Sequence, residues 1–578
     1  MPGDAQIHSI RGWLPGLALA ALVLAVFGPA LAGGYVDDDL DLMTTSPAFR
    51  GPGQLVAAVV SPFWGYELPY WRPLTSLVMG LGHWLGGGSP WLLHAAALLA
   101  HTVATVLVRR LLRQLGCSAP LAWLGAASFA VLPTQVEAVA WVAALADPLA
   151  GMATLGCVSA WLRWRDRGGA RAPWAAWLWF VLALAAKENG LFVLPWLAAI
   201  EIVRRQEVVP GRRRAGLGFA ALVLSWYGAR CLVFGDLAAG FDRGDLGLGL
   251  DAGTGALLRL YLGAAFVGLP SGWFGITPYR SIPPDAAALW RALPWPLLAL
   301  AAAVSAWRVA RRHHGGLAFV AAVGFAASLL PVLLAPDRAG PWPLVDRYAY
   351  LAAFAYAAVL VAAGATRPWL AAVLVLVAAV VSAAHVPAWR DQDAVVAAAR
   401  RRVPRHPEVL AMAGHQALAA AERATDAAAR NAAYRTAHDH FVAALRGLQR
   451  PLYAARALQR TIGPSARLGQ ALAAAYGRLV PAAAALAAFA PLLQERPDDT
   501  AVLLAFGAAA ASLDDVRTAE QAWQRAFVVD PACDQAACNL GRLYLLAGQR
   551  EAARRWLTTT LRLRPDNQLA ASLLQQLR

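Results

Sequence analysis

Charged residues are scarce in this chain of 578 residues. They make up 15% of the sequence, against about 25% in a typical soluble domain, whereas hydrophobic residues make up 59%. Cysteines number only five, and their spacing predicts neither a disulfide framework nor a cysteine-based metal site. These shortages exclude an ordinary soluble domain and a disulfide-stapled secreted protein, and they favour a protein that lies largely in a membrane.

Long apolar runs fill the segment between residues 13 and 385. A helix of roughly 17–25 apolar residues crosses a bilayer, so we predict an all-α fold that begins with a polytopic membrane helix bundle of about 11 spans. The predicted spans lie near residues 13–32, 90–108, 119–134, 147–162, 174–186, 189–203, 215–234, 293–307, 316–335, 347–365 and 368–385. The alternative for the first run is a cleavable secretory signal, because Arg11 precedes it and Ala30-Leu31-Ala32 resembles a cleavage site.

The net charge of +16 does not predict a nucleic-acid partner, because the arginines lie in short loops between the predicted spans. The clusters are Arg11; Arg109, Arg110 and Arg113; Arg163, Arg165, Arg167 and Arg171; Arg204, Arg205, Arg212, Arg213 and Arg214; Arg308, Arg311 and Arg312; and Arg367. All of them fall on one side of the membrane, which the positive-inside rule makes cytoplasmic. The C-terminal part then lies outside, provided that residues 235–292 stay outside, with 256–269 as an interfacial or re-entrant helix.

The opposite side collects ionisable residues at the ends of the apolar runs. The groups are Asp37–Asp41, Tyr70-Trp71-Arg72-Pro73, Val136-Glu137, Lys187-Glu188-Asn189, Asp242 with Asp245, and Asp346-Arg347-Tyr348. Any one of them can simply mark a membrane interface, but six groups on one face predict a site. Carboxylates among cations suit the deprotonation of an acceptor hydroxyl and the departure of a phosphate. The substrate would be a lipid-linked phosphate sugar that enters from the bilayer.

A soluble tail follows the last predicted span. Pro497, Pro531 and Pro565 recur at an interval of 34 residues, the tetratricopeptide period. Residues at the expected offsets are Gly507, Ala519, Trp523 and Ala526 in one repeat, Leu540, Gly541, Tyr544 and Ala553 in the next, and Ala485 and Phe489 in a weaker one. We predict a membrane domain over 1–388, a helical linker or degenerate repeats over 389–463, and repeats over 464–578. Such repeats stack into an α-solenoid with a concave surface.

Several segments together resemble a known family. They are Asp38-Asp39 followed by Ser46-Pro47; Tyr70-Trp71-Arg72-Pro73-Leu74; His94 and His101; the run from Phe129 to Trp141, which contains Val136-Glu137-Ala138-Val139-Ala140-Trp141; Ala186-Lys187-Glu188-Asn189-Gly190; Asp346-Arg347-Tyr348; and Trp389-Arg390-Asp391. In these segments and their order the sequence resembles glycosyltransferases of the GT-C fold, specifically the transmembrane and tetratricopeptide-repeat O-mannosyltransferases and their bacterial relatives.

Two segments depart from that family pattern. Relatives often have His-Pro where this chain has Leu132-Pro133, and many bacterial members have Arg-Lys-Asp where it has Leu145-Ala146-Asp147. A cation that could touch the donor is therefore missing. Either Arg72, Lys187 and Arg347 suffice, or the donor differs, or the activity is impaired.

The resemblance implies a polyprenyl-phosphate donor, with a mannose-like hexose favoured, and a hydroxyl of a protein or glycan as acceptor. It places the base in the first outside loop, where Asp38 is the first candidate, Asp39 its partner and Asp37 the third. Direct displacement of the lipid phosphate predicts inversion at the anomeric carbon. No cofactor or metal is required, although adjacent aspartates permit a divalent cation. Glu137 is implied as a further catalytic residue, which positions the acceptor or supports the Asp pair. The other implied residues are Arg72, Lys187 and Arg347 for the phosphate, and Tyr70, Glu188, Asp346, Tyr348 and His94 in support.

Each of these residues also has a structural alternative. Asp39 can orient its loop by accepting backbone N–H groups, and Glu137 can cap a helix. Lys187 can pair with Glu188, and Arg347 with Asp346. His94 and His101 lie seven residues apart on one helix face, which favours buried packing or hydrogen bonding.

Other functions stay open beside the transferase. A non-catalytic membrane anchor for a repeat scaffold and a polysaccharide polymerase or ligase are the alternatives, while the absence of paired broken helices disfavours a transporter. High alanine and arginine with few lysines favours a GC-rich bacterial genome. We then expect an inner-membrane protein with a cytoplasmic N-terminus, and with the site and the tail in the periplasm.

Overall fold

The computed structural model describes residues 2–65, 70–207, 209–238, 315–334, 345–365, 367–426, 497–511, 514–565 and 567–577, together with isolated positions between them. Every secondary-structure element in these ranges is helical. The chain forms two compact units, Met1–Val403 and Pro404–Arg578. The span near 293–307, the helix at 256–269, Asp242, Asp245, Ala485 and Phe489 lie outside the described residues.

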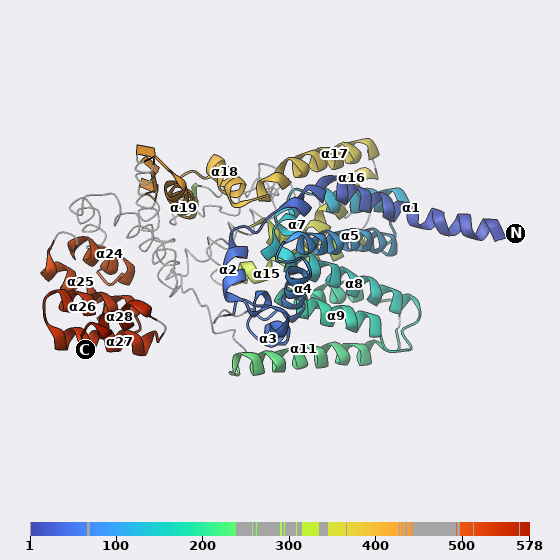
Figure 1. Ribbon diagram of the computed structural model, residues 1–578. Helices are drawn as coiled ribbons and strands as arrows, with labels where there is room; N and C mark the ends of the chain where they lie inside the picture. The colour runs from blue at the N-terminus through green and yellow to red at the C-terminus, as the bar shows by residue number, and fades with distance from the viewer. Residues whose placement is uncertain are drawn as a thin grey trace. The chain divides into compact units, whose positions relative to one another are not determined.

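Long apolar helices build the first unit (Figure 1). They are α1 (Pro2–Phe27), α5 (Trp91–Gln114), α6 (Ala119–Val131), α8 (Ala146–Asp166), α9 (Trp174–Ala186), α10 (Val193–Val203), α11 (Arg212–Phe234), α15 (Gly315–Leu334), α16 (Ala353–Gly364) and α17 (Pro368–His385). Each overlaps a predicted span. Five described segments are long and apolar enough to cross a membrane: Trp13–Ala32, Trp91–Gln114, Val142–Asp166, Arg212–Phe234 and Pro368–Trp389. The polytopic membrane bundle is therefore confirmed, whereas the number of 11 spans stays a prediction.

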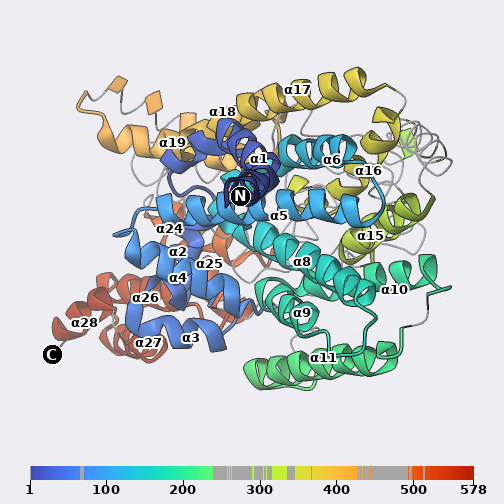
Figure 2. The same ribbon diagram turned by 90° about the vertical axis from the view of Figure 1, so that its right-hand side faces the viewer.

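Helix α8 is the centre of this unit. It packs between α5 and α9, with α11 on the outer side of α9 (Figure 2). Small residues allow this close packing: a Cβ atom on Gly151 would lie 2.3 Å from the Tyr350 ring, and one on Gly156 would lie 2.5 Å from the Trp179 ring. Close approach at small residues is the usual basis of helix packing in membranes.

Short helices gather at one end of the bundle. They are α2 (Asp38–Thr45), α3 (Leu55–Val60), α4 (Pro73–Leu85) and α7 (Gln135–Ala140), with 3-10 turns at Glu188–Phe192, Asp346–Ala349 and Val386–Trp389. The sequence did not predict α4. It begins at Pro73, whose fixed φ angle suits the first helical position, and ends at Gly86. These short elements bring distant segments of the chain to one face.

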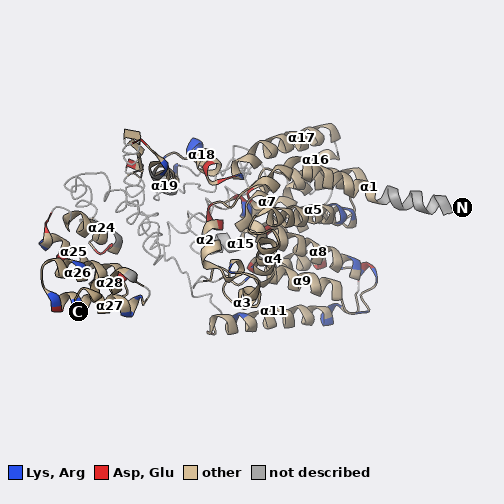
Figure 3. Ribbon diagram, in the orientation of Figure 1, with Lys and Arg blue, Asp and Glu red and all other residues tan. Residues whose placement is uncertain are grey.

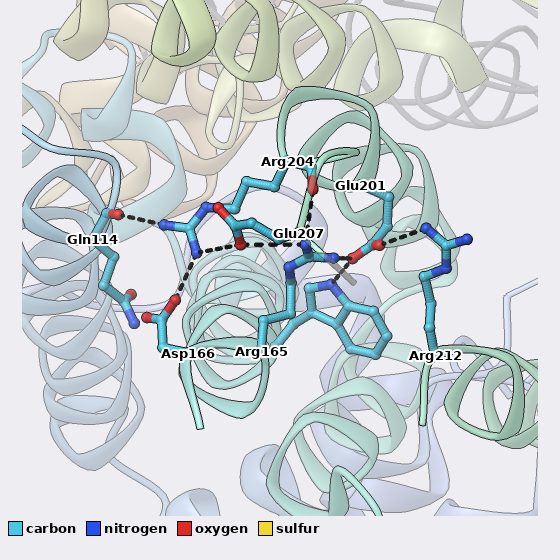
Figure 4. A network of polar contacts seen from close by, with 8 residues as sticks. Gln114, Arg165, Asp166, Glu201, Arg204, Glu207 and Arg212 are labelled. Carbon is cyan, nitrogen blue, oxygen red and sulfur yellow. Dashed lines mark hydrogen bonds and ion pairs between the residues drawn. The ribbon is translucent and has the colours of Figure 1, made fainter. Parts of the chain in front are cut away.

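Ion pairs join the helix ends at the other end of the bundle (Figure 4). Arg165, whose side chain is fully buried, pairs with Glu201 and Glu207 and donates a hydrogen bond to the Arg204 carbonyl. Arg204 in turn lies 2.6 Å from Asp166 and donates to the Gln114 carbonyl at 3.2 Å. The network joins the ends of α5 and α8 to α10 and the following turn. Figure 3 shows basic residues at these ends of α5, α8 and α11, away from α2.

Paired helices form the described part of the second unit. They are α24 (Thr500–Ala511), α25 (Val516–Val529), α26 (Asp534–Leu546), α27 (Arg550–Leu563) and α28 (Gln568–Gln575), and α19 (Pro407–Arg423) also belongs to this unit. A Cβ atom on Gly507 would lie 2.5 Å from Trp523 Nε1, and one on Gly541 would lie 2.7 Å from Leu557 Cγ. Glycine thus lets each pair close, which confirms the two predicted repeats and the all-α fold class.

Candidate active site

The loop that follows the first predicted span carries the acidic cluster into the bundle. Asp39 is buried, and its carboxylate accepts the N–H of Val36 at 2.9 Å and that of Ala143 at 2.6 Å. Burial raises the pKa of Asp39 well above its ordinary range, although the two backbone hydrogen bonds oppose this shift. Asp39 therefore holds the loop against the segment before α8. This agrees with the predicted alternative in which Asp39 orients its loop by accepting backbone N–H groups.

The neighbouring aspartates differ from Asp39. Asp38 is half-buried, and its charge acts on Arg347. Asp37 adopts a φ of 52°, outside the range that most residues favour. Its N–H donates to Gln392 Oε1 at 2.8 Å, and the N–H of Gly34 donates to the Arg390 carbonyl at 2.7 Å. Of the three, Asp38 is accessible and lies close to a cation, which are the requirements of a base for a bound substrate.

A partly buried ion pair joins Glu137 of α7 to Arg347 of the 3-10 turn Asp346–Ala349. The second carboxylate oxygen of Glu137 accepts the N–H of Asp346 at 2.9 Å. The Arg347 guanidinium lies over the Trp141 ring, 4.8 Å from its centre. Arg347 thus pairs with Glu137 instead of with its sequence neighbour Asp346, and its side chain keeps 19% of its exposure, enough to meet a ligand.

Arg72 and Glu188 form a second ion pair at 3.1 Å. The guanidinium also lies 4.7 Å from the centre of the Tyr70 ring. Glu188 accepts the N–H of Trp71 at 3.0 Å and lies 3.7 Å from Nη1 of Arg230. Burial lowers the pKa of Arg72, but Glu188, Tyr70 and Asp147 together outweigh burial, so the net shift of the pKa is upward. Arg72 therefore stays cationic beside an aromatic face.

Lys187 forms the third ion pair. Its Nζ lies 2.6 Å from Oδ1 of Asp147, in the first turn of α8, and both side chains are buried. Thr75 Oγ1 donates to the carbonyl of Ala186 at 2.7 Å, which fixes the backbone next to Lys187. Burial lowers the pKa of Lys187, Arg72 and Arg347 lower it further, and Asp147 opposes them. Lys187 thus pairs with Asp147 instead of with Glu188.

The structure brings the predicted site residues together from five segments of the chain. The described members are Asp38, Asp39, Tyr70, Arg72, Glu137, Lys187, Glu188, Asp346, Arg347 and Tyr348, which form the charged cluster together with Asp147. His94 lies apart from the ion pairs. It is buried, and a Cβ atom on Gly33 would lie 3.0 Å from its Nε2. His101 is also buried and hydrogen-bonds Tyr350 and the carbonyl of Ala130.

Two charged residues of the site were missed from the sequence. Asp147 stands at the first position of a predicted span, where a carboxylate marks the membrane boundary. Arg230 lies inside the predicted span 215–234, packed against the Trp226 and Phe234 rings. An ionisable residue within a span usually faces the interior of the bundle and has a role there. That signal points to Arg230, and the family comparison of residues 145–147 points to Asp147.

An apolar groove lies behind the Arg347 side of the site. Its lining includes Pro29, Ala30, Val386 and Trp389. Trp389 stacks on Trp141 at 5.3 Å between ring centres, and Trp141 carries the Arg347 guanidinium on its ring. Two stacked aromatic rings therefore link the groove to Arg347. In the described part of the chain, no three His, Cys, Asp or Glu side chains gather as a metal site would need.

Curated proteins with related sequences are protein O-mannosyl-transferases. Tmtc2 of Drosophila melanogaster is 31% identical over 201 residues, 32% of this chain and 21% of that protein. TMTC1 of Mus musculus is 31% identical over 204 residues, 32% of this chain and 22% of that protein. Tmtc1 of Drosophila melanogaster is 33% identical over 192 residues, 31% and 22% of the two chains.

The chain is similar to these O-mannosyl-transferases. This confirms the resemblance predicted from the sequence, although the match spans only about a fifth of the length of each of these relatives. No model of a known protein family matches the chain. Among solved structures, the tetratricopeptide protein YrrB, described with an unusual peptide-binding site, is 20% identical with a TM-score of 0.22, over 32% of this chain and 81% of that one.

Proposed function

We propose that this chain is a membrane glycosyltransferase that moves a hexose, with mannose favoured, from a polyprenyl phosphate to a hydroxyl group of a protein. The observation that carries the proposal is the charged cluster. Arg72, Lys187 and Arg347 come from separate segments, and each is held by its own carboxylate. Preorganised cations stabilise the charge that develops on a leaving phosphate, and the similarity to O-mannosyl-transferases supports the same chemistry.

In the proposed reaction Asp38 is the base. It accepts the proton of the acceptor hydroxyl while the hydroxyl oxygen bonds to the anomeric carbon of the sugar. The bond between that carbon and the phosphate oxygen breaks, and the electron pair stays on the lipid phosphate. Displacement from the opposite face inverts the anomeric carbon. Asp39 holds the loop that carries Asp38, and Glu137 holds Arg347.

The lipid part of the donor would lie in the apolar groove. Most of its lining residues belong to the ends of the membrane segments Trp13–Ala32 and Pro368–Trp389, so an isoprenoid chain can reach it from the bilayer. The stacked rings of Trp389 and Trp141 lead from the groove to Arg347. An apolar tail in the groove would thus place a phosphate at the cations.

The proposed setting is a bacterial inner membrane with the site in the periplasm. The arginine-rich loops support this orientation through the positive-inside rule. The tetratricopeptide repeats would bind the acceptor protein, because stacked repeats form concave peptide-binding surfaces. A C-terminal alkaline phosphatase fusion tests the orientation, since this enzyme is active only outside the cytoplasm.

Mass spectrometry of periplasmic proteins and surface glycans tests the function. Cells with the wild-type chain, cells without it, and cells with Asp38→Asn at a matched protein level are compared. We expect a sugar mass that is present only with the wild type. A modification that survives Asp38→Asn would overturn the assignment of the base. If no glycan differs among the three strains, the non-catalytic scaffold is the better explanation.

A further inference from the structure

We propose that Asp147 is a positioning residue, which holds the Lys187 ammonium in place for the donor phosphate so that donor binding depends on this carboxylate. The inference rests on the proposed function, because the phosphate belongs to the donor proposed above. It adds a residue that the resemblance assigned no role. The contact of Lys187 Nζ with Asp147 Oδ1 at 2.6 Å is its starting point.

Lys187 is the one lysine of the chain. The sequence contains 51 lysine and arginine residues, and all of the others are arginines. An ammonium is a compact point charge with three donors that rotate freely, whereas a guanidinium is a planar fork. An ammonium therefore suits a buried position from which hydrogen bonds must go to a carboxylate on one side and to a phosphate on another. We infer from the single lysine that position 187 requires an ammonium and not a guanidinium.

The ammonium of Lys187 has more N–H donors than acceptors around it. Lys187 is 5% exposed, and across the described ranges Asp147 is its one hydrogen-bond partner. The Tyr348 ring lies 5.5 Å from Nζ and offers a cation–π contact in place of an acceptor. A buried N–H group without an acceptor costs free energy. Two such groups favour a ligand that brings several oxygen atoms, as a phosphate does.

The groups that face Lys187 explain why Asp147 is needed. They are Arg72 from the segment before α4, Arg347 and Tyr348 from the 3-10 turn, and Asp147 from α8. Like charges at short range repel one another, so each cation needs a counter-ion. Arg72 has Glu188 and Arg347 has Glu137. Asp147 is the counter-ion of Lys187, and its charge also acts on Arg72 and Arg347. The N-terminus of α8 stabilises its carboxylate in turn.

Replacing Asp147 by asparagine tests the charge of the side chain while its shape stays nearly the same. Asp147→Asn keeps the size of the side chain and a hydrogen-bond acceptor, but it removes the counter-ion of Lys187. Burial, Arg72 and Arg347 already lower the pKa of Lys187, so the loss of Asp147 lowers it further. We expect the affinity for a polyprenyl monophosphate to fall at least tenfold at pH 8 and to recover in part at pH 6. Asp147→Glu should retain most of the affinity.

The single lysine makes a direct measurement possible. Growth with lysine labelled with ¹⁵N at Nζ gives one side-chain signal without any mutation. The full chain is held in a phosphate-free detergent, with and without a polyprenyl monophosphate. Magnetic dephasing of the Nζ signal by the ³¹P nucleus reports their proximity, and a titration from pH 6 to pH 9 reports the protonation of Lys187. Asp166→Asn, at the opposite end of α8, is the matched control.

We expect dephasing in the wild type and in Asp166→Asn, and its loss in Asp147→Asn at pH 8 with recovery at pH 6. In the wild type, the affinity for polyprenyl monophosphate and the Nζ signal should change over the same pH range. If the wild type binds and dephases but Asp147→Asn does the same at pH 8, the role of Asp147 is overturned while the proposed function stands. If the wild type binds no polyprenyl monophosphate at all, the proposed function itself fails.

Discussion

Glu137 and Arg347 lie 210 residues apart in the sequence and form an ion pair in which Glu137 is buried and Arg347 is partly exposed. The pair connects α7 with the turn that precedes α16, and the Asp346 N–H adds a second bond to Glu137. An ion pair that leaves water loses hydration, and removing one partner strands the other charge. The pair is therefore part of the fold as well as part of the proposed phosphate site.

The substitution Glu137→Gln is expected to destabilise the membrane unit and to abolish transfer. Breaking a buried ion pair costs about 3 kcal/mol, which chemical denaturation in detergent would measure. The double variant Glu137→Met with Arg347→Met is the control, because apolar side chains replace both charges. It should recover most of the stability while transfer stays absent. Recovery of transfer in the double variant would remove both residues from the site.

The stability of the membrane unit should depend on pH through Asp39. In an unfolded chain an aspartate titrates near pH 3.9, while burial raises the pKa of Asp39 in the folded protein. The folded protein then binds more protons between these two values, so the stability falls as the pH rises through this window. Asp39→Asn should flatten that part of the curve of thermal midpoint against pH. An unchanged curve would show that Asp39 is ionised when folded.

The opposite end of the bundle offers a test of stability alone. Arg165→Met removes a fully buried guanidinium and leaves the half-buried Glu201 with Arg212 and the Trp161 indole as partners. We expect a loss of about 1–3 kcal/mol with an unchanged affinity for polyprenyl monophosphate. Glu207→Gln is the control, because Glu207 keeps 56% of its exposure and should change little. A weaker affinity in Arg165→Met would show that the two ends of the bundle communicate.

In the repeats, Gly541→Ala tests the close contact of α26 with α27. Alanine favours a helix over glycine by about 1 kcal/mol, but the new Cβ would meet Leu557 at 2.7 Å. Overpacking of this kind costs about 1–3 kcal/mol, so the net effect is a loss. Hydrogen exchange of the full chain should accelerate in α26 and α27. Gly228→Ala, where nothing lies within 4 Å, should show no such acceleration.

Chelation tests whether a divalent cation takes part. We expect transfer to survive dialysis against EDTA, because Arg72, Lys187 and Arg347 already supply positive charge for the leaving phosphate. The assay follows a labelled sugar from lipid to acceptor. A loss that Mg²⁺ or Mn²⁺ restores would contradict this and would point to the acidic loop as the ion site.

The helices of the bundle were predictable because the length and apolarity of a run decide whether it spans a bilayer. Helix α4 escaped prediction, since Thr75, Ser76 and His83 interrupt its apolar residues. The two repeats were predictable from the 34-residue interval, because glycine and tryptophan stand at the positions where the paired helices meet.

The sequence predicted which residues belong to the candidate site, but it did not predict which of them form ion pairs with one another. The ion pairs of Lys187, Arg72 and Arg347 join residues 40, 116 and 210 positions apart. Such partners are fixed by how the helices pack, which a single sequence does not specify. The pairings with Glu188 and Asp346 that sequence proximity favoured were therefore wrong.

The acidic loop is tied to the start of the soluble tail. The N–H groups of Gly34 and Asp37 reach Arg390 and Gln392, residues that directly follow the last membrane segment. A partner that displaces residue 390 must therefore displace the loop as well. Because thermodynamic linkage is reciprocal, a donor that fixes the loop must change the affinity for such a partner by the same factor. The two hydrogen bonds therefore couple the binding of a donor at the membrane site to the binding of a partner at the tail.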